Sequence, residues 1–208
     1  MTRKIIFTFI ITLVFSIQPV LAQRKSCKSA DIAYERKQYN TAIERYKKAL
    51  KKSGKKKKKQ DDRDYITYQL AECYRLTETT KLAESHYKRL LKTEYPRLYP
   101  TIYLYYADAL KRNKKYEEAA ANYAIYNELM PDDPRGVAAL EDIANIQIWL
   151  DAPTKYEVTR IKKLNSRSSE FGVSWTSNNY NEVIFSSTRE GGVSKEKDAI
   201  TGQHFADF

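Results

Sequence analysis

The sequence contains few of the residues from which catalytic and metal sites are usually built. Its 208 residues include 2 histidines, 2 cysteines and 6 glycines. His86 and His204 lie far apart, and the chain has no glycine-rich phosphate loop, nucleophile elbow, His-Glu-x-x-His or Cys-x-x-Cys pattern. No cluster of metal-ligand residues is evident in the sequence. We therefore expect that the protein is not an enzyme and that it binds no metal and no cofactor.

The chain has so few cysteines that only one disulfide could form within it. Cys27 and Cys73 are the only cysteines. If the chain is exported, an oxidising compartment would allow a disulfide between them. Two small buried residues are the alternative, and the sequence leaves both interpretations open.

Long apolar runs are missing after residue 22, so we expect no transmembrane span in the mature chain. Before that point, Arg3 and Lys4 precede an apolar run over residues 5–17, Pro19 ends the run, and Ala22 offers a small residue to signal peptidase. We predict a secretory signal peptide over residues 1–22, and therefore export to the periplasm. An uncleaved membrane anchor is the alternative, although it needs a longer run of about 20 residues.

Acidic residues are outnumbered by basic ones, 26 against 37, which gives a formal net charge of +11. Seven lysines fall within the nine residues Lys51–Lys59, and such a block predicts a solvated loop. We expect no nucleic-acid partner, because an exported chain meets none and the block lacks interleaved aromatic residues for base stacking. Contact with an anionic polymer or with lipid headgroups is the remaining alternative.

Tyrosine, in contrast, is abundant, with 17 residues against 7 phenylalanines and 2 tryptophans. Its ring can be buried while the hydroxyl stays near water, which suits thin, layered folds. Three segments repeat one pattern, in which a small residue lies twelve positions before a second one and sixteen before a tyrosine. The members are Ala30, Ala42 and Tyr46, then Ala71, Ala83 and Tyr87, then Ala107, Ala119 and Tyr123.

This spacing predicts antiparallel helical hairpins. Alanines at the crossing let two helices approach closely, and the tyrosine one turn further on fills the space where they diverge. A single hairpin cannot bury its apolar face alone, so we expect the hairpins to stack. Residues 135–150 form a further amphipathic stretch, which predicts a helix capping the last hairpin or a partial fourth repeat.

The segments between Ser26 and Pro134 resemble tetratricopeptide repeats. They differ in period, because the second alanines are 41 and then 36 residues apart, against about 34 in the family. The resemblance implies a superhelix over residues 23–150 whose first helices line a concave face. It places ten residues in a partner-binding groove: Tyr34, Glu35, Tyr65, Tyr68, Glu72, Arg75, Leu104, Asp108, Lys111 and Arg112. An ordinary exposed face without a ligand is the alternative.

Residues 151–208 have a different pattern. The stretch from Tyr156 to Leu164 alternates roughly, Val183–Phe185 is a short apolar run, and Asn-Asn and Gly-Gly pairs predict turns, so we expect a β region after a short linker. Ser169–Gly172 (Ser-Glu-Phe-Gly) and Val183–Arg189 (Val-Ile-Phe-Ser-Ser-Thr-Arg) resemble the first blade of the WD-like propellers that follow tetratricopeptide repeats in bacterial OmpA-family proteins. Thr201–Gln203, with Phe205 and Phe208, resembles the next strand of that family.

Taken together, these features predict a mostly α fold: a tetratricopeptide-type superhelix followed by a short β segment that forms an incomplete propeller blade. The resemblance implies a non-catalytic interaction scaffold at the outer membrane of a Gram-negative bacterium, in an OmpA-family component of the type IX secretion or gliding apparatus. It also implies binding to other envelope proteins through the helical repeats, and to peptidoglycan through further domains of a longer protein. A periplasmic peptide- or glycan-binding module unrelated to secretion is the alternative.

Overall fold

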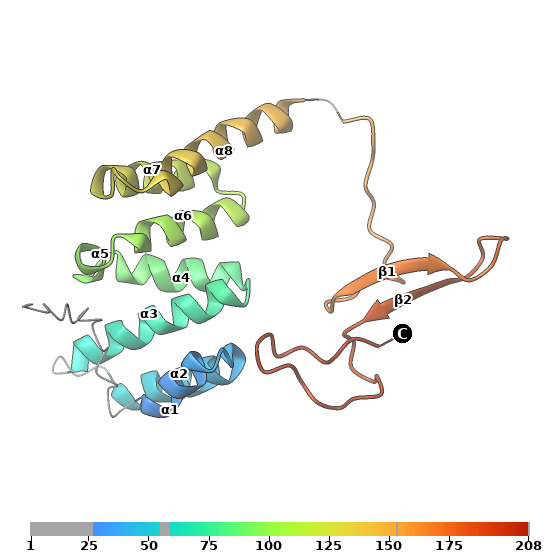
Figure 1. Ribbon diagram of the computed structural model, residues 1–208, viewed down its shortest axis with the longest axis horizontal. Helices are drawn as coiled ribbons and strands as arrows, with labels where there is room; N and C mark the ends of the chain where they lie inside the picture. Colours follow the sequence, from blue (N-terminus) through green and yellow to red (C-terminus); the bar gives the residue numbers. More distant parts are fainter. Residues whose placement is uncertain (1–26, 55–58, 153, 208) are drawn as a thin grey trace, which may run out of the picture.

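The computed structural model describes residues 27–54, 59–152 and 154–207, so the predicted signal peptide lies outside the described residues. Within these ranges the chain forms eight helices followed by one antiparallel pair of strands (Figure 1). The prediction of a mostly helical chain with a short β segment is confirmed. The helices are α1 (Lys28–Glu35), α2 (Tyr39–Ser53), α3 (Gln60–Leu76), α4 (Thr80–Leu90), α5 (Tyr95–Leu98), α6 (Thr101–Arg112), α7 (Tyr116–Leu129) and α8 (Pro134–Asp151), and the strands are β1 (Glu170–Trp175) and β2 (Val183–Ser187).

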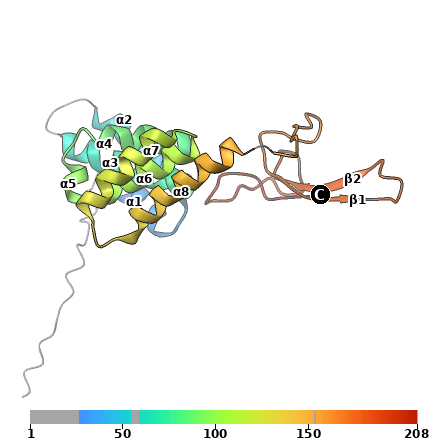
Figure 2. The same cartoon turned by 90° about the horizontal axis from the view of Figure 1, so that it is seen from above.

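The helices pair into hairpins, and the hairpins stack. α1 with α2, α3 with α4 and α6 with α7 make the three hairpins, while α2 also contacts α3, α4 contacts α6 and α7 contacts α8. In Figure 1 the stack rises from α1 and α2 at the bottom to α7 and α8 at the top, and Figure 2 shows the sheet beyond one side of it. Each hairpin therefore covers the apolar side of the next, as short antiparallel helix pairs require.

The three hairpin turns share one backbone conformation. Lys37, Glu78 and Lys114 occupy the left-handed region, with φ values of 59°, 56° and 63°. The amide of each donates to the carbonyl three residues earlier at 2.8–3.2 Å, and the next amide donates to the carbonyl five residues earlier at 2.8–2.9 Å. This is the Schellman arrangement that ends many helices, and its left-handed position is usually glycine.

We expect Lys114→Gly to stabilise the protein by about 0.5–1 kcal/mol, because glycine adopts a positive φ without the clash that a Cβ atom causes. Lys114 is exposed, so little side-chain packing is lost. Lys88→Gly, at an exposed position inside α4, is the matched control and should destabilise by about 1 kcal/mol. Urea unfolding curves give both values. A Lys114→Gly protein that is less stable than the parent would contradict the turn geometry.

Small side chains and tyrosine rings fill the interiors of the hairpins. The six alanines and three tyrosines of the repeated pattern are each at most 1% exposed: Ala30, Ala42, Tyr46, Ala71, Ala83, Tyr87, Ala107, Ala119 and Tyr123. Protein interiors are packed as densely as organic crystals, so a helix pair built around alanine has no room for a larger side chain at the same place. The alanines that are spaced twelve residues apart thus belong to one continuous core that runs through the stack.

His86, on α4, is a buried titratable side chain without a full set of partners. It is 9% exposed, its ring centroid lies 5.3 Å from that of Tyr74, and its Nδ1 has no hydrogen-bond partner. Burial, followed by the nearby charges of Arg89 and Lys47, lowers the pKa of His86 to about 4. The folded protein therefore holds this imidazole neutral.

The low pKa of His86 predicts a loss of stability in mild acid. Its unfolded pKa is about 6.5, so its contribution is complete above that pH and is lost as the pH falls from 6.5 toward 4. Relative to His86→Phe, the wild-type free energy of unfolding should fall by about 2–3 kcal/mol between pH 7 and pH 4. Denaturant unfolding across this range measures the difference, and parallel pH profiles for the two proteins would contradict it.

The lysine block differs partly from its prediction as a loop. α2 continues through Lys51 and Lys52 to Ser53, while residues 55–58 lie outside the described ranges. Cations at a helix C-terminus interact favourably with the helix dipole, which allows the first lysines of the block to remain helical.

α8 covers the last hairpin with its first half only. Gly136 and Ala139 are its buried residues, and a Cβ atom at Gly136 would lie 1.9 Å from Asn127 Oδ1, so a larger residue there would displace the Asn127 side chain. Ile148, Trp149 and Leu150 are 60–69% exposed. None of the helices in the described ranges has the length and apolar character needed to cross a bilayer.

β1 and β2 pair between Glu170↔Ser187 and Trp175↔Val183, with an extra residue on β1 between Phe171 and Ser174. Gly172 has a φ of 65° at this irregularity, as expected for the glycine of a β-bulge. The predicted alternating strand at 156–164 is wrong: it pairs with no strand in the described part of the chain, and Val158 is 94% exposed. An extended segment needs a ladder partner to become a strand.

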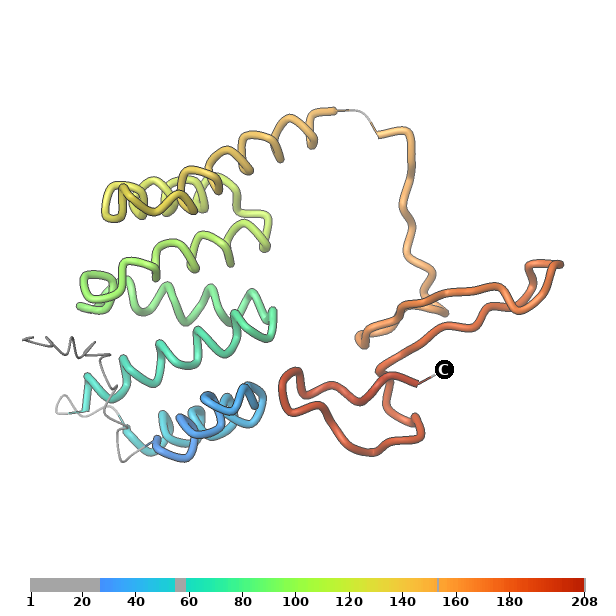
Figure 3. Tube along the Cα trace, viewed as in Figure 1, coloured from blue at the N-terminus to red at the C-terminus, as the bar shows by residue number. Residues whose placement is uncertain are grey.

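The segment after β2 also differs from the expected strand. Residues 199–201 form a turn in which the Asp198 carboxylate accepts bonds from the amides of Thr201 and Ile200 at 2.7 and 2.9 Å, which lower the pKa of Asp198. Further on, Asp207 pairs with Ser187 of β2. Figure 3 shows this red loop returning toward α2, where the Asn40 amide donates to the Ala199 carbonyl at 3.1 Å.

Candidate protein-binding face of the first helices

The ten predicted groove residues all lie on the first helices of the hairpins, α1, α3 and α6, and we call the side that they mark the first-helix face. Tyr65, Glu72 and Leu104 are 7%, 5% and 4% exposed, so they belong to the interior behind this face. The other seven reach its surface: Tyr34, Tyr68, Arg75, Asp108 and Lys111 are half-buried, and Glu35 and Arg112 are exposed. The structure thus divides the predicted set into a surface and a supporting layer.

A tyrosine–carboxylate hydrogen bond recurs in every hairpin. Tyr46 donates to Asp31 at 2.6 Å, Tyr123 donates to Asp108 at 2.6 Å, and Tyr87 donates to Glu72. In each hairpin the two residues are fifteen positions apart. Burial, together with the neighbouring carboxylate, raises the pKa of all three tyrosines well above the ordinary value.

These pairs were not predicted, although the sequence carries a signal for them. An acidic residue directly follows the first alanine in each repeat, as Ala30-Asp31, Ala71-Glu72 and Ala107-Asp108. Glu72 and Asp108 were assigned to the groove, whereas the structure directs them toward the tyrosine of the second helix. Asp31 was not singled out at all, yet it also accepts a bond from Tyr65 at 3.0 Å and so links the first two hairpins.

Arg75 lies in the last turn of α3, the second of the three first helices. Its Nη2 lies 2.7 Å from Glu72 Oε2, and its guanidinium carbon lies 4.2 Å from the ring centroid of Tyr105 on α6. Cation–π contact and ion pairing therefore hold one arginine between two hairpins. Burial, followed by the charge of Glu72, raises the pKa of Tyr34 and Tyr68 beside it.

A small hollow of about 280 Å³ opens between the C-terminal halves of α3 and α6. Its polar lining includes Arg75, Glu78, Tyr105, Asp108 and Arg112. Arg112 Nη1 lies 3.3 Å from Glu78 Oε1, and both side chains are more than half exposed. Two arginines and two carboxylates therefore line this end of the face.

A larger hollow of about 830 Å³ lies at the N-terminal end of α3, against α5. We call it the tyrosine hollow, and its lining residues are Gln60, Asp61, Asp64, Tyr65, Lys92, Thr93, Glu94, Tyr95, Leu98 and Tyr99. Behind it, the ring of Tyr68 stacks on that of Tyr99 with centroids 5.3 Å apart, and the centroids of Tyr95 and Tyr99 are 5.6 Å apart.

Sequence reasoning missed Tyr95 and Tyr99 because they fall between two hairpins, outside the repeated pattern. Their signal is the spacing of four residues, which places two rings on one side of a helical turn. α5 supplies that turn, with Pro96 at its start, where proline is favoured.

Within the described ranges, no group of three or more His, Cys, Asp or Glu residues could hold a metal ion. Cys27 and Cys73 are both buried thiols, and burial, followed by the charge of Glu72, raises the pKa of Cys73 to about 12. A thiol with this pKa stays protonated at neutral pH and is a poor nucleophile.

A scan against protein-family models and a search of the curated proteins found no match to this chain. The class of protein is therefore described by its structure, as a stack of three helical hairpins joined to a two-stranded sheet.

Proposed function

We propose that this chain is a non-catalytic scaffold that docks another protein on its first-helix face. The observation that carries the proposal is the threefold recurrence of one hairpin, with the same turn, the same buried alanine pair and the same tyrosine–carboxylate bond. Each stacked repeat has two functional sides. One side packs against the neighbouring hairpins, and the other remains open as part of an extended surface.

The composition of the open surface supports protein binding. Tyrosine and arginine are enriched at the energetic centres of protein interfaces, because they give a large contact area together with hydrogen bonds. Tyr34, Tyr68, Arg75 and Tyr105 combine these residue types on adjoining helices. This surface composition and the repeated sequence pattern are the two reasons for which we propose that the hairpins are of the tetratricopeptide type.

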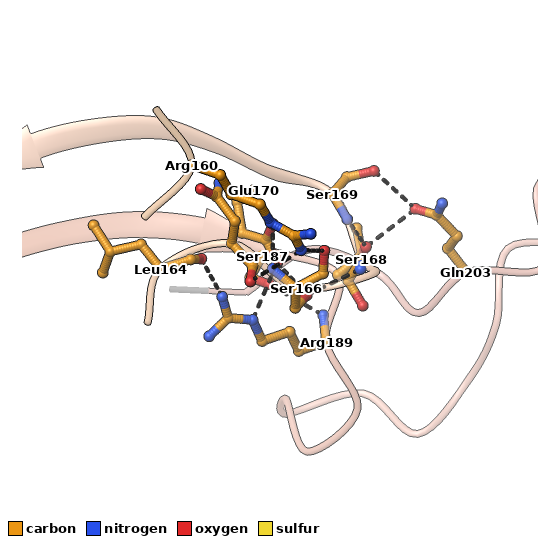
Figure 4. Close-up of polar contacts among 11 residues, drawn as sticks. Arg160, Leu164, Ser166, Ser168, Ser169, Glu170, Ser187, Arg189 and Gln203 are labelled. Atoms are coloured by element: carbon orange, nitrogen blue, oxygen red, sulfur yellow. Dashed lines mark hydrogen bonds and ion pairs between the residues drawn. The ribbon is translucent and has the colours of Figure 1, made fainter. Parts of the chain in front are cut away.

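We further propose that residues 151–208 are a linker and part of a propeller blade. The side chains that carry the resemblance also form one polar network (Figure 4): Arg189 Nε lies 3.1 Å from Glu170 Oε1, and its guanidinium also donates to the Leu164 carbonyl. Ser169 and Thr188 both contact Gln203, at 3.2 and 3.1 Å. Such a motif fixes the ends of the strand pair, which supports the blade interpretation.

The apolar side chains of the strands support it too. Phe171, Val173 and Trp175 on β1 are 50–62% exposed, as expected for a blade that packs against other blades. In this proposal the chain belongs to an OmpA-family protein of the periplasm and outer membrane, within a secretion or gliding apparatus. Further domains of that protein would bind peptidoglycan.

A pull-down from solubilised envelope, with residues 23–208 as bait, tests the proposal. We expect recovery of subunits of the secretion apparatus, and we expect Arg112→Glu to reduce recovery at least fivefold, because it reverses a charge on the first-helix face. Lys88→Glu, an equal charge reversal at an exposed site on α4, should leave recovery unchanged. Equal recovery with both variants would contradict docking on the first-helix face.

A periplasmic peptide- or glycan-binding module is the second candidate, and the tyrosine hollow favours it, because aromatic rings with polar neighbours bind short ligands. Recovery of short peptides or sugars alone, without subunits of the apparatus, would support this function over the first.

A further inference from the structure

The tyrosine hollow combines aromatic rings with an excess of negative charge. Tyr65, Tyr95 and Tyr99 supply the rings, Asp61, Asp64 and Glu94 supply three carboxylates, and Lys92 is the one cation among the lining residues. Glu94 also pairs with Arg97 at 3.1 Å, and Asp64 accepts a bond from Gln60 at 2.6 Å, whereas Asp61 is exposed. Asp61 belongs to the first turn of α3, where the helix dipole stabilises a carboxylate. The helix dipole therefore offsets part of the cost of placing Asp61 in this lining.

This lining selects among ligand classes. Three carboxylates would repel an anion. A purely apolar side chain would remove water from those carboxylates without replacing it by a polar contact. An extended cation with an apolar stem matches both parts, because its stem packs on tyrosine rings while its charge faces the carboxylates. A volume of about 830 Å³ holds such a side chain together with the backbone on either side of it.

The chain already contains one example of this recognition. Arg75 lies 4.2 Å from the centroid of Tyr105 and 2.7 Å from Glu72, so an aromatic ring and a carboxylate together hold a guanidinium on the neighbouring part of the same face. The tyrosine hollow offers the same pair of groups in a larger space that opens to solvent.

We propose that the tyrosine hollow binds a lysine or arginine side chain of the segment that docks on the first-helix face. The identity of that segment rests on the proposed function, whereas the preference of the hollow for a cation depends only on its own residues. The partner is thus a segment with a basic residue placed at the α3–α5 end of the face.

Titration with two small probes tests the proposal, and the protein is residues 23–208. N-acetyl-arginine amide should shift the ring signals of Tyr95 and Tyr99 in NMR spectra, and N-acetyl-citrulline amide, which has the same shape but is uncharged, should bind at least tenfold more weakly. Equal binding of the two probes would overturn the proposal, because it would show recognition without charge.

Two substitutions with opposite signs separate binding from a structural effect. Asp61→Asn removes an exposed carboxylate and should weaken the arginine probe about threefold to tenfold, while Lys92→Gln removes the competing cation and should strengthen it by a similar factor. Glu44→Gln, at an exposed site on α2, is the matched control and should change nothing. A common direction of change for Asp61→Asn and Lys92→Gln would overturn the proposal.

These probes need no partner protein, so the result is independent of the pull-down. Loss of secretion subunits from the pull-down with normal arginine binding would contradict the proposed function alone. Normal pull-down with no arginine binding would contradict the cation site alone.

Discussion

Ala119→Leu should destabilise the protein by about 3 kcal/mol or more, the largest effect that we expect from a single apolar substitution. Ala119 lies on α7 and is 0% exposed, in the contact between α7 and α6. Three additional carbon atoms at this crossing must push the two helices apart or force neighbouring side chains from their preferred rotamers. Because each hairpin supports the next, the displacement also weakens the contacts of α7 with α8.

Ala124→Leu provides the control, since Ala124 lies on the same helix and faces solvent. Alanine and leucine have similar helix propensities, so this substitution should change stability by less than about 0.5 kcal/mol. Thermal and urea unfolding, followed by circular dichroism, measure both. Equal stability of the two variants would mean that α6 and α7 do not cross at Ala119.

Arg75→Met should cost about 2–3 kcal/mol, because it leaves the carboxylate of Glu72 buried without its cation. The side chain of Glu72 is 7% exposed and that of Arg75 is 32% exposed, so the pair is only partly open to solvent. The same substitution removes the contact between the guanidinium and the ring of Tyr105, which joins two hairpins.

A double variant distinguishes the loss of the cation from the loss of packing. In Glu72→Gln/Arg75→Met no buried charge remains, so more than about 1 kcal/mol of the stability should return. Arg97→Met breaks an ion pair of similar spacing whose side chains are 78% and 80% exposed, and it should have almost no effect. A double variant as unstable as Arg75→Met would contradict the role assigned to the buried charge.

The sequence was sufficient to predict where helices contact helices. Alanine pairs twelve residues apart have a direct steric meaning, and all six of these alanines lie in the core. The polar interior was harder to predict, because an acid beside a buried alanine has the same appearance as an acid on an exposed helix face. Only the direction of the side chain distinguishes Glu72, which is 5% exposed, from a surface carboxylate.

The remaining differences come from contacts that lie outside any local period. α5 and its two tyrosines follow from no repeat, yet they complete the tyrosine hollow by packing against α3. Residues 156–164 show the converse, because alternation alone predicts a strand but cannot supply its partner. At the start of the lysine block, the stability of α2 outweighed the repulsion between neighbouring charges.

Ionisation of individual tyrosine rings is the most direct test of the repeated hairpin interior. Tyr46, Tyr87 and Tyr123 each have a raised pKa, so their contribution to stability is present below pH 10 and is lost as the pH rises further. NMR spectra of the ring Cζ carbons, assigned with Tyr→Phe variants, should show all three un-ionised until the chain unfolds in base. If any of the three ionised near pH 10, as in the urea-unfolded chain, while the protein stayed folded, the common hairpin interior would be contradicted.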